Sequence, residues 1–483
     1  MRERLPKKWD YETEVAVIGA GAAGPAVAIS AHSAGAKVLI LERMDEPGGD
    51  MALSAGIVYA AGTSIQRELG IEDSADRMYK LYMAAVPHSN RKERERLKTI
   101  CEGSAEVIDW LLGLGVKIPA VMGTPGLSYS GLEHLPEYAQ VVSPVPGAHM
   151  CEGEGKGIQD ILMKEVKRRG IDLLTRTRGR ELMLDSSGEI IGLRAERDGT
   201  PIHIRAKRGV VICSGHFAHN KKLIELYCPK YADFATYTAI GLEGDGLIMA
   251  QAVGAAVANI SEFRVNVGMV YEPGKALYVY RWCPCVLVNK QGRRFINDHA
   301  GYDPLAKAIL EQEGGMGFVI FDEATRKNVG NNLLMPPLSP DLSREVEVGL
   351  AKRADTFRAL AEKIDVDPAA LENTLMNYNE NARLGKDPEF GSTHFLEPIS
   401  HPPFYAIKCE PTISAPTGGL DTDLDARVLD VFGRAIPRLY AVGTAASLCP
   451  GYPGGGANMV SIFHLGRIAG RHAAVEPLRR NRK

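Results

Sequence analysis

The sequence lacks a long apolar run, a strong net charge and an apolar signal core. No stretch reaches the ~18 apolar residues of a transmembrane helix, and residues 1–10 are basic without the apolar segment of a secretory signal. The formal net charge of −2 argues against a nucleic-acid or anionic-membrane partner. These absences, with 45% hydrophobic and 24% charged residues, leave an ordinary soluble globular protein, for which we expect a cytoplasmic location.

Cysteine is sparse and scattered. The eight cysteines include Cys283 and Cys285, whose spacing is too tight for a usual zinc knuckle, and no C-x-x-C-H haem motif occurs. We therefore expect buried free thiols, no metal site and a reducing compartment.

A glycine-rich turn near the start of the chain is the strongest motif. Gly19, Gly21 and Gly24 follow the first apolar run in the spacing G-x-G-x-x-G, and a predicted helix follows them. Gly19 makes the turn, Gly21 lets the backbone approach a pyrophosphate, and Gly24 lets the helix pack closely on the strand. The helix N-terminus then presents free N–H groups to the phosphates. The next apolar run ends at Glu42, an acid placed to hydrogen-bond a ribose.

Further elements favour FAD over a nicotinamide cofactor. Residues 47–50 and 54–56 combine glycines with a small hydroxyl residue, which lets the chain pass close to a cofactor beyond its pyrophosphate. Near the C-terminus, a buried strand ending at Gly443 and a helix opened by residues 454–458 resemble the second FAD fingerprint of glutathione-reductase-like flavoproteins. No second G-x-G-x-x-G turn is followed by a strand and an acid. The residues that we expect to contact FAD are Gly19, Gly21, Ala22, Ala23, Gly24, Glu42, Arg43, Gly48, Gly49, Asp50, Ser54, Ala55, Gly56, Gly215, Asp245, Gly443, Thr444, Gly456, Asn458 and Val460.

The two FAD elements lie at opposite ends of the sequence, which predicts an inserted domain. We predict an α/β fold: a doubly wound, Rossmann-like FAD-binding domain from residues 1–262 and 405–483, with an inserted α+β cap or catalytic domain at 263–404. An amphipathic stretch spans residues 93–114. Residues 119–146 are rich in Gly, Pro, Ser and Tyr, which indicates a long loop.

Together these motifs resemble the FAD-dependent fumarate reductase and 3-ketosteroid dehydrogenase family along nearly the whole chain. The resemblance implies that flavin and substrate meet between an FAD domain and a cap. It also implies non-covalent FAD, because residues 52–54 lack the histidine that succinate dehydrogenases have there. The markers of the resemblance are residues 19–24, 48–49, 54–56, 244–246, 288–289, 292–297, 417–419 and 439–443.

The residue types resemble the ketosteroid dehydrogenases more closely than the fumarate reductases. Fumarate reductases place an arginine proton donor shortly after the R-F-x-N element, whereas residues 298–303 offer Tyr302 and no arginine. Residues 451–457 resemble the Y-P-G-P-G-A stretch of 3-ketosteroid Δ1-dehydrogenases, which implies that the Tyr452 hydroxyl and the Gly456 N–H bind a ketone oxygen. The N-terminal third looks closer to the Δ4-(5α) branch, so the position of the double bond stays open.

This resemblance implies removal of two hydrogens from adjacent carbons beside the ketone of a steroid or a smaller alicyclic ring. The α-hydrogen leaves as a proton to a base, for which we favour Tyr302, and the β-hydrogen leaves as hydride to flavin N5. Tyr452 and Gly456 would stabilise the developing oxyanion by ~3 kcal/mol per donor. A tyrosine base with a pKa near ~10 needs a neighbour or a positive field. The candidate neighbours are Tyr129, Tyr138 and His299.

Two other functions fit the same residues. A reductase of an enone or enoate would use them in the opposite direction with electrons from a separate donor, and a flavin-binding redox protein would not turn over at all. Arg264 or Arg281 facing the flavin would indicate a small keto acid rather than a sterol. His216 stands where the family usually has glycine, and it either reaches the site or is a structural histidine. The electron acceptor or donor and the oligomeric state stay open.

Overall fold

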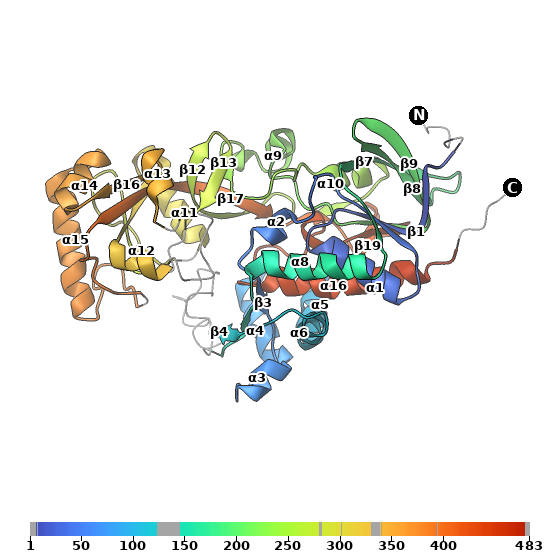
Figure 1. Ribbon diagram of the computed structural model, residues 1–483, viewed down its shortest axis with the longest axis horizontal. Coiled ribbons are helices and arrows are strands. Elements are labelled where there is room, and N and C mark those ends of the chain that lie inside the picture. The colour runs from blue at the N-terminus through green and yellow to red at the C-terminus, as the bar shows by residue number, and fades with distance from the viewer. Residues whose placement is uncertain are drawn as a thin grey trace.

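The part of the molecule that contains the glycine-rich turn is built around a largely parallel β-sheet (Figure 1). The computed structural model describes residues 6, 8–122, 145–279, 283–300, 302–329, 339, 341–393 and 395–478. The sheet has the order β19-β20-β9-β1-β2-β6, and β7 and β8 join it through β9. Its strands are β1 (Tyr11–Ile18), β2 (Val38–Leu41), β6 (Asp172–Leu174), β7 (Thr177–Leu184), β8 (Ile190–Arg197), β9 (Thr200–Ile212), β19 (Arg427–Leu429) and β20 (Ala435–Ala441).

Strand β1 lies in the middle of this sheet and has both faces covered. It pairs in parallel with β2 and β9. Val15 and Val17 face one hydrophobic core, whereas Ala16 and Ile18 face another. A continuous apolar run is typical of such a strand. The buried parallel strand predicted at 208–215 is the end of β9, which pairs in parallel with β1 and β20.

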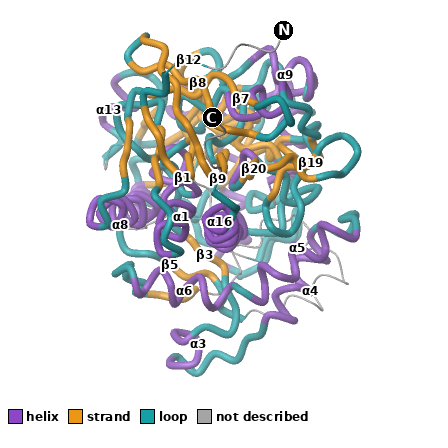
Figure 2. Tube along the Cα trace, turned by 90° about the vertical axis from the view of Figure 1, so that its right-hand side faces the viewer, coloured by secondary structure: helices purple, strands orange, loops and turns teal. Residues whose placement is uncertain are grey.

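Helices cover the two faces of the sheet. Helix α1 packs against α8 and α16, and Figure 2 shows these three helices beside one another beneath the strands. On the other face, Leu247 and Met249 of α10 join the second core. This layering confirms the predicted α/β class. The helices of this part are α1 (Ala23–Ser33), α2 (Gly49–Ala52), α8 (Glu154–Arg168), α9 (Lys221–Tyr227), α10 (Asp245–Ala252) and α16 (Ala457–Val475), with 3₁₀ turns at Pro229–Tyr231 and Gly443–Ala445.

A helical layer with a small sheet lies on the far side of α16. The amphipathic stretch at 93–114 divides into two helices at Gly103, where a Cβ would come 2.2 Å from the His464 ring. The predicted loop at 119–146 contains a short strand, β4, and its residues 123–144 lie outside the described residues. The elements of this layer are α3 (Ser64–Glu68), α4 (Ala75–Ala85), α5 (Arg91–Glu102), α6 (Ser104–Gly113), β3 (Ile57–Tyr59), β4 (Ala120–Met122) and β5 (Ala148–Met150), with the sheet order β3-β5-β4.

A second large sheet occupies the other end of the molecule (Figure 1). Its order is β10-β13-β12-β17-β15-β14, with β16 beside β17. The long strand β17 pairs first with β15 and then with β12, so it runs from the outer end of the second sheet back toward the first. Its strands are β10 (Ala235–Thr236), β12 (Phe263–Glu272), β13 (Lys275–Tyr278), β14 (Val286–Val288), β15 (Gly317–Asp322), β16 (Ala351–Ala354) and β17 (Phe404–Pro416).

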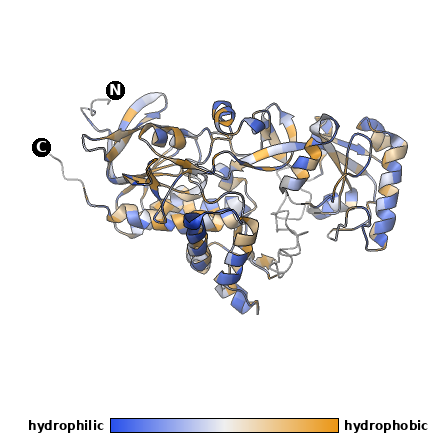
Figure 3. Cartoon of the chain, turned by 180° about the vertical axis from the view of Figure 1, so that it is seen from behind, coloured by the Kyte–Doolittle hydropathy of each residue, from blue (hydrophilic) through white to orange (hydrophobic). Residues whose placement is uncertain are grey.

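Two helices of this second part, α14 and α15, lie at its outer end (Figure 1), and α15 is largely hydrophilic (Figure 3). The predicted limits of the inserted domain, 263 and 404, coincide with the first residues of β12 and β17. The division into domains itself stays a prediction. The remaining elements are α11 (Tyr302–Leu310), α12 (Glu323–Val329), α13 (Ser343–Glu347), α14 (Phe357–Lys363), α15 (Pro368–Arg383), the 3₁₀ turn Glu313–Gly315, and a two-stranded sheet of β11 (Val257–Ala258) and β18 (Gly419–Leu420).

Candidate flavin site and active site

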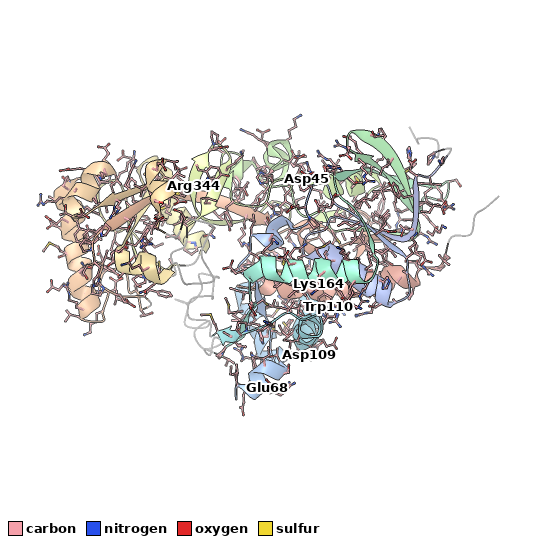
Figure 4. The ribbon with its side chains drawn as sticks, in the orientation of Figure 1. Asp45, Glu68, Asp109, Trp110, Lys164 and Arg344 are labelled. Carbon is pink, nitrogen blue, oxygen red and sulfur yellow. The ribbon has the colours of Figure 1, made fainter. Side chains whose placement is uncertain are left out.

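A cavity of about 670 Å³ opens where the ends of β1 and β9 approach β12 and β17. Every residue that we predicted to contact FAD lines this cavity, except Gly24 and Val460. Figure 4 shows Asp45, another lining residue, well apart from Trp110 on the helical layer. The two FAD motifs, which lie at opposite ends of the sequence, therefore meet at one cavity.

The glycine turn is packed too tightly for larger residues. A Cβ at Gly24 would come 1.9 Å from the Gly19 carbonyl oxygen. One at Gly19, where φ is +104°, would come 2.4 Å from the Cys213 oxygen. Gly24 thus permits the close packing of α1 on β1 and lies behind the cavity wall. Gly21 faces the cavity, where the nearest atom to a Cβ is the Gly48 oxygen at 3.5 Å, so the turn leaves the room that a pyrophosphate needs.

Helices α1 and α16 both begin at the cavity without a capping side chain. Their N-cap residues are Ala22 and Gly456, and both line the cavity. Uncapped N–H groups and the partial positive charge of two helix starts fit the anionic groups of a dinucleotide such as FAD. Val460, one turn into α16, is fully buried, and its N–H bonds the Gly456 oxygen at 3.3 Å.

The Glu42 carboxylate fixes the turn and the segment after β2. One oxygen accepts a hydrogen bond from the Ala20 N–H at 2.9 Å, and the other accepts one from the Met44 N–H at 2.9 Å. The side chain still lines the cavity. Each carboxylate oxygen has a second lone pair, so Glu42 retains acceptor capacity for a ribose hydroxyl.

Arg43 and Asp245 belong to a network of charged side chains at the cavity edge. Arg43 contacts Glu243 at 3.0 Å and Asp245 at 3.4 Å. Arg178 contacts the same two carboxylates, at 2.7 and 2.5 Å. The network joins β7 to the start of α10, so these two predicted cofactor residues also hold the cavity edge together.

His216 lies behind the cavity, where it holds Asp50. The side chain of His216 is inaccessible to solvent, and its Nε2 lies 2.8 Å from Oδ2 of Asp50. Asp50 is surrounded by protein but 37% exposed, because it faces the cavity. Burial opposes ionisation of Asp50, yet the His216 ring and the Ala239 N–H outweigh it, so the pKa of Asp50 is lowered. His216 is therefore a structural partner of a cavity residue.

Tyr452 and Gly456 meet at the cavity, close to Arg264. Burial raises the pKa of Tyr452, whereas the Arg264 charge and a hydrogen bond from the Gly456 backbone oppose this rise. The Arg264 guanidinium lies 4.4 Å from the centre of the Tyr452 ring. Its Nε–H donates to the Ser414 hydroxyl at 2.9 Å. Tyr452, Gly456 and Arg264 thus line the same cavity, and both Gly456 and Arg264 hydrogen-bond the Tyr452 hydroxyl.

The other predicted catalytic residues are only partly placed. Tyr302 is the first residue of α11, and its side chain lies outside the described residues. Tyr129, Tyr138 and Arg281 also lie outside them. The His299 ring contacts the Cys283 oxygen at 3.0 Å and does not line the cavity.

The sequence did not predict several of the residues that line the cavity. Residues 237–242, between β10 and α10, cover one side of the cavity but carry no recognisable motif. Asn266 and Ser414 also line it. Asn266 stands two positions after Arg264 on β12, and the alternation of a strand would have placed both on one face.

All eight cysteines are buried free thiols. In the described part of the chain, no cluster of His, Cys, Asp and Glu is arranged to hold a metal ion. No helix among the described residues has the length and apolar character needed to cross a bilayer.

Fold and cavity together define a flavin-type dinucleotide-binding protein. The chain belongs to the FAD binding domain family, whose model matches residues 14–460. Fumarate reductase (cytochrome) from Shewanella frigidimarina is 28% identical over 463 residues, which cover 95% of this chain and 77% of that protein. Urocanate reductase from Eggerthella lenta is 28% identical, covering 98% and 76% of the two chains. The structure of 3-ketosteroid-Δ4-(5α)-dehydrogenase from Rhodococcus jostii RHA1 matches with a TM-score of 0.73 and 28% identity, covering 98% and 100%.

The predicted family and cofactor are therefore confirmed. The protein is a flavin-dependent oxidoreductase of the fumarate reductase and ketosteroid dehydrogenase family, and its cofactor is FAD.

Proposed function

We propose that this protein introduces a C=C bond beside the carbonyl group of a small-molecule substrate, a ring ketone in the first instance. The observation that supports the proposal is that Tyr452 and Gly456 line the same cavity as the FAD motifs. The Gly456 N–H now donates to the Tyr452 hydroxyl, and with substrate bound the two groups would instead share one carbonyl oxygen. When bound, FAD supplies the acceptor for the β-hydrogen, which leaves as hydride.

The protein side chains supply the acid–base part of this reaction. The Tyr452 hydroxyl and the Gly456 N–H would polarise the carbonyl, which makes the α-hydrogen more acidic and stabilises the oxyanion. The positive charge of Arg264, 4.4 Å from the Tyr452 ring, would strengthen the Tyr452 hydroxyl as a donor. Tyr302, at the start of α11, remains our candidate for the base that takes the α-proton.

The direct test is anaerobic mixing of the yellow holoenzyme with substituted cyclohexanones and 3-ketosteroids. Loss of flavin absorbance near ~450 nm together with a product two mass units lighter is the expected result. Tyr452→Phe should slow flavin reduction by roughly 10²–10³-fold while FAD stays bound. Tyr405→Phe is a matched control, because the Tyr405 hydroxyl bonds Glu323 at 2.8 Å, away from the cavity. If Tyr452→Phe reduces its flavin as fast as the wild type, the Tyr452 hydroxyl does not bind the substrate carbonyl.

A second candidate is the reverse reaction, reduction of an enone or enoate with electrons from a separate donor. Relatives at 28% identity are named as fumarate and urocanate reductases, and Arg264 supplies a cation at the cavity. The same residues would serve both directions. Two results together would favour the reductase function: no ketone lowers the flavin absorbance, and an enone or enoate reoxidises the pre-reduced enzyme.

A further inference from the structure

Asp50 places a carboxylate in the wall of the flavin cavity. It is the second residue of α2 and directly follows Gly48 and Gly49, which line the cavity with it. Two groups hold the carboxylate in place. Nε2 of His216 lies 2.8 Å from Oδ2, and the Ala239 N–H donates to Oδ1 at 2.8 Å. The Asp50 side chain is still 37% exposed, so its charge acts directly on whatever fills the cavity.

The surroundings of Asp50 keep it ionised. Burial opposes the charge, but the His216 ring, the Ala239 N–H and the charge of Arg264 outweigh burial, so the pKa of Asp50 is lowered. The His216 side chain is inaccessible to solvent and does not belong to the residues that line the cavity. Of this pair, the carboxylate is therefore the group that faces the cofactor.

The loop between β10 and α10 shows where Asp50 lies along the cavity. Residues 237–241 line the cavity and interact with three of its side chains in order. They first act electrostatically on Tyr452, then bond Asp50, and finally accept a hydrogen bond from Arg43. Arg43 directly follows Glu42, which is placed for the ribose of the adenosine half of FAD. Asp50 therefore lies beyond that half, toward the end of the cavity that receives the flavin ring.

A fixed negative charge near a flavin alters the equilibrium between its oxidised and reduced forms. Reduction adds two electrons to the ring, so a nearby carboxylate destabilises the reduced form more than the oxidised form. Asp50 itself exchanges neither an electron nor a proton in this equilibrium. Arg264 acts on Asp50 from the wall of the same cavity, and its positive charge works in the opposite sense. The contribution of Asp50 is therefore the change in potential when its charge alone is removed.

We propose that Asp50, held by His216 and the Ala239 N–H, lowers the reduction potential of the bound FAD. A lower potential makes the reduced flavin a stronger electron donor and the oxidised flavin a weaker acceptor. The carboxylate thus favours reduction of an alkene over removal of hydrogens from a ketone. Asp50 therefore biases the direction in which the same active site runs.

The experiment measures the potential of the holoenzyme without substrate. Anaerobic reduction by xanthine and xanthine oxidase, with a reference dye present, gives the ratio of reduced to oxidised flavin. Asp50→Asn removes the charge and keeps the size of the side chain and an oxygen for the Ala239 N–H. At the same dye potential its flavin should be ~10–100-fold more reduced than that of the wild type, a rise of ~30–60 mV for two electrons. Asp50→Glu keeps the charge and should keep the potential low.

Asp45→Asn is the matched control. Asp45 lines the same cavity but is exposed, and it lies two residues past Arg43, near the ribose end. It should keep the wild-type potential. Equal potentials of Asp50→Asn and the wild type, or an equal rise in Asp45→Asn or Asp50→Glu, overturn the proposal. If Asp50→Asn does not retain FAD, the measurement is made on Asp50→Ser, which is neutral and keeps a hydroxyl for the Ala239 N–H.

The absence of substrate separates this inference from the proposed function. It rests on the FAD cofactor alone, so an unchanged potential in Asp50→Asn leaves the ketone chemistry untouched. A protein that no ketone reduces still shows the effect of Asp50 on the potential, because the dye and not the substrate reports it.

Discussion

His216 and Asp50 lie 166 residues apart in the sequence, yet their side chains meet at 2.8 Å behind the flavin cavity. The Ala218 N–H lies 3.2 Å from Nδ1 of His216, and the other ring nitrogen, Nε2, faces the Asp50 carboxylate. Ala239 donates to the other carboxylate oxygen at 2.8 Å. The pair thus ties the segment after β2 to the loops after β9 and β10.

Replacing His216 should loosen this junction. In His216→Leu the Asp50 carboxylate keeps the Ala239 N–H but loses its other donor, which should cost about 1–3 kcal/mol of unfolding free energy. FAD should also dissociate more readily, because Asp50 lines its cavity. Chemical denaturation and flavin release measure the two effects. His203→Leu is the control, since His203 lies near Asp10 at 3.9 Å and away from the cavity. Equal stability of the two variants would contradict the structural role of His216.

The glycine turn allows a test of packing apart from chemistry. Gly24→Ala places a Cβ 1.9 Å from the Gly19 oxygen, and both atoms belong to rigid backbone. We expect a loss of at least ~3 kcal/mol, or protein that does not retain FAD. Gly113→Ala is the matched control in α6, because no atom lies within 4 Å of a Cβ there. It should be neutral or stabilise the protein by up to ~1 kcal/mol. Thermal unfolding with and without added FAD measures both.

The sequence predicted the parts of the site that depend on local spacing. The turn at 19–24, Glu42 after β2, and the strand and helix around Gly443 and Gly456 each carry their own short motif, and the fold brings them to one cavity. Pairings such as Asp50 with His216, or Arg264 with Tyr452, could not be predicted. The first pairing depends on how the segments after β2 and β9 fold together, and the second on how β12 meets the segment before α16; no short motif records either arrangement.

Residues 292–297, one of the segments that carry the family resemblance, contribute Arg294 to a buried cluster of charged side chains. Arg294 contacts Asp298 at 2.6 Å and Asp387 at 2.8 Å, and all three side chains are at most 2% exposed. Arg294→Met would leave two buried carboxylates without their cation, which should cost ~3–5 kcal/mol. Because the cluster lies away from the cavity, the flavin spectrum of the folded fraction should not change.

The neighbouring residue provides the control for this cluster. Arg293 is exposed, so Arg293→Met should stay within about 0.5 kcal/mol of the wild type. Urea unfolding of the two variants side by side measures the difference. Similar unfolding midpoints would show that the buried ion cluster contributes little to the free energy of unfolding, which is also true of some other buried ion pairs.

His464 on α16 should make stability depend on pH. Its Nε2 is buried and has no hydrogen-bond partner among the described residues. Burial, with the charge of Arg467 second, lowers its pKa to about 4. The unfolded chain takes up this proton near ~6.5. Between these values the unfolded state binds more protons, so stability should fall as pH is lowered from ~6.5 to ~4 and the effect should stop growing below that.

His464→Gln removes the titrating group, so its stability should depend less steeply on pH across this window. The difference should be at most ~3 kcal/mol and smaller than this limit because the ring is only partly buried. Urea unfolding at several pH values between ~4 and ~7 gives both slopes. His472→Gln, on the same helix and half-buried, should keep the wild-type slope. A wild-type slope in His464→Gln as well would mean that other groups cause the acid sensitivity, because a neutral glutamine cannot take up the proton.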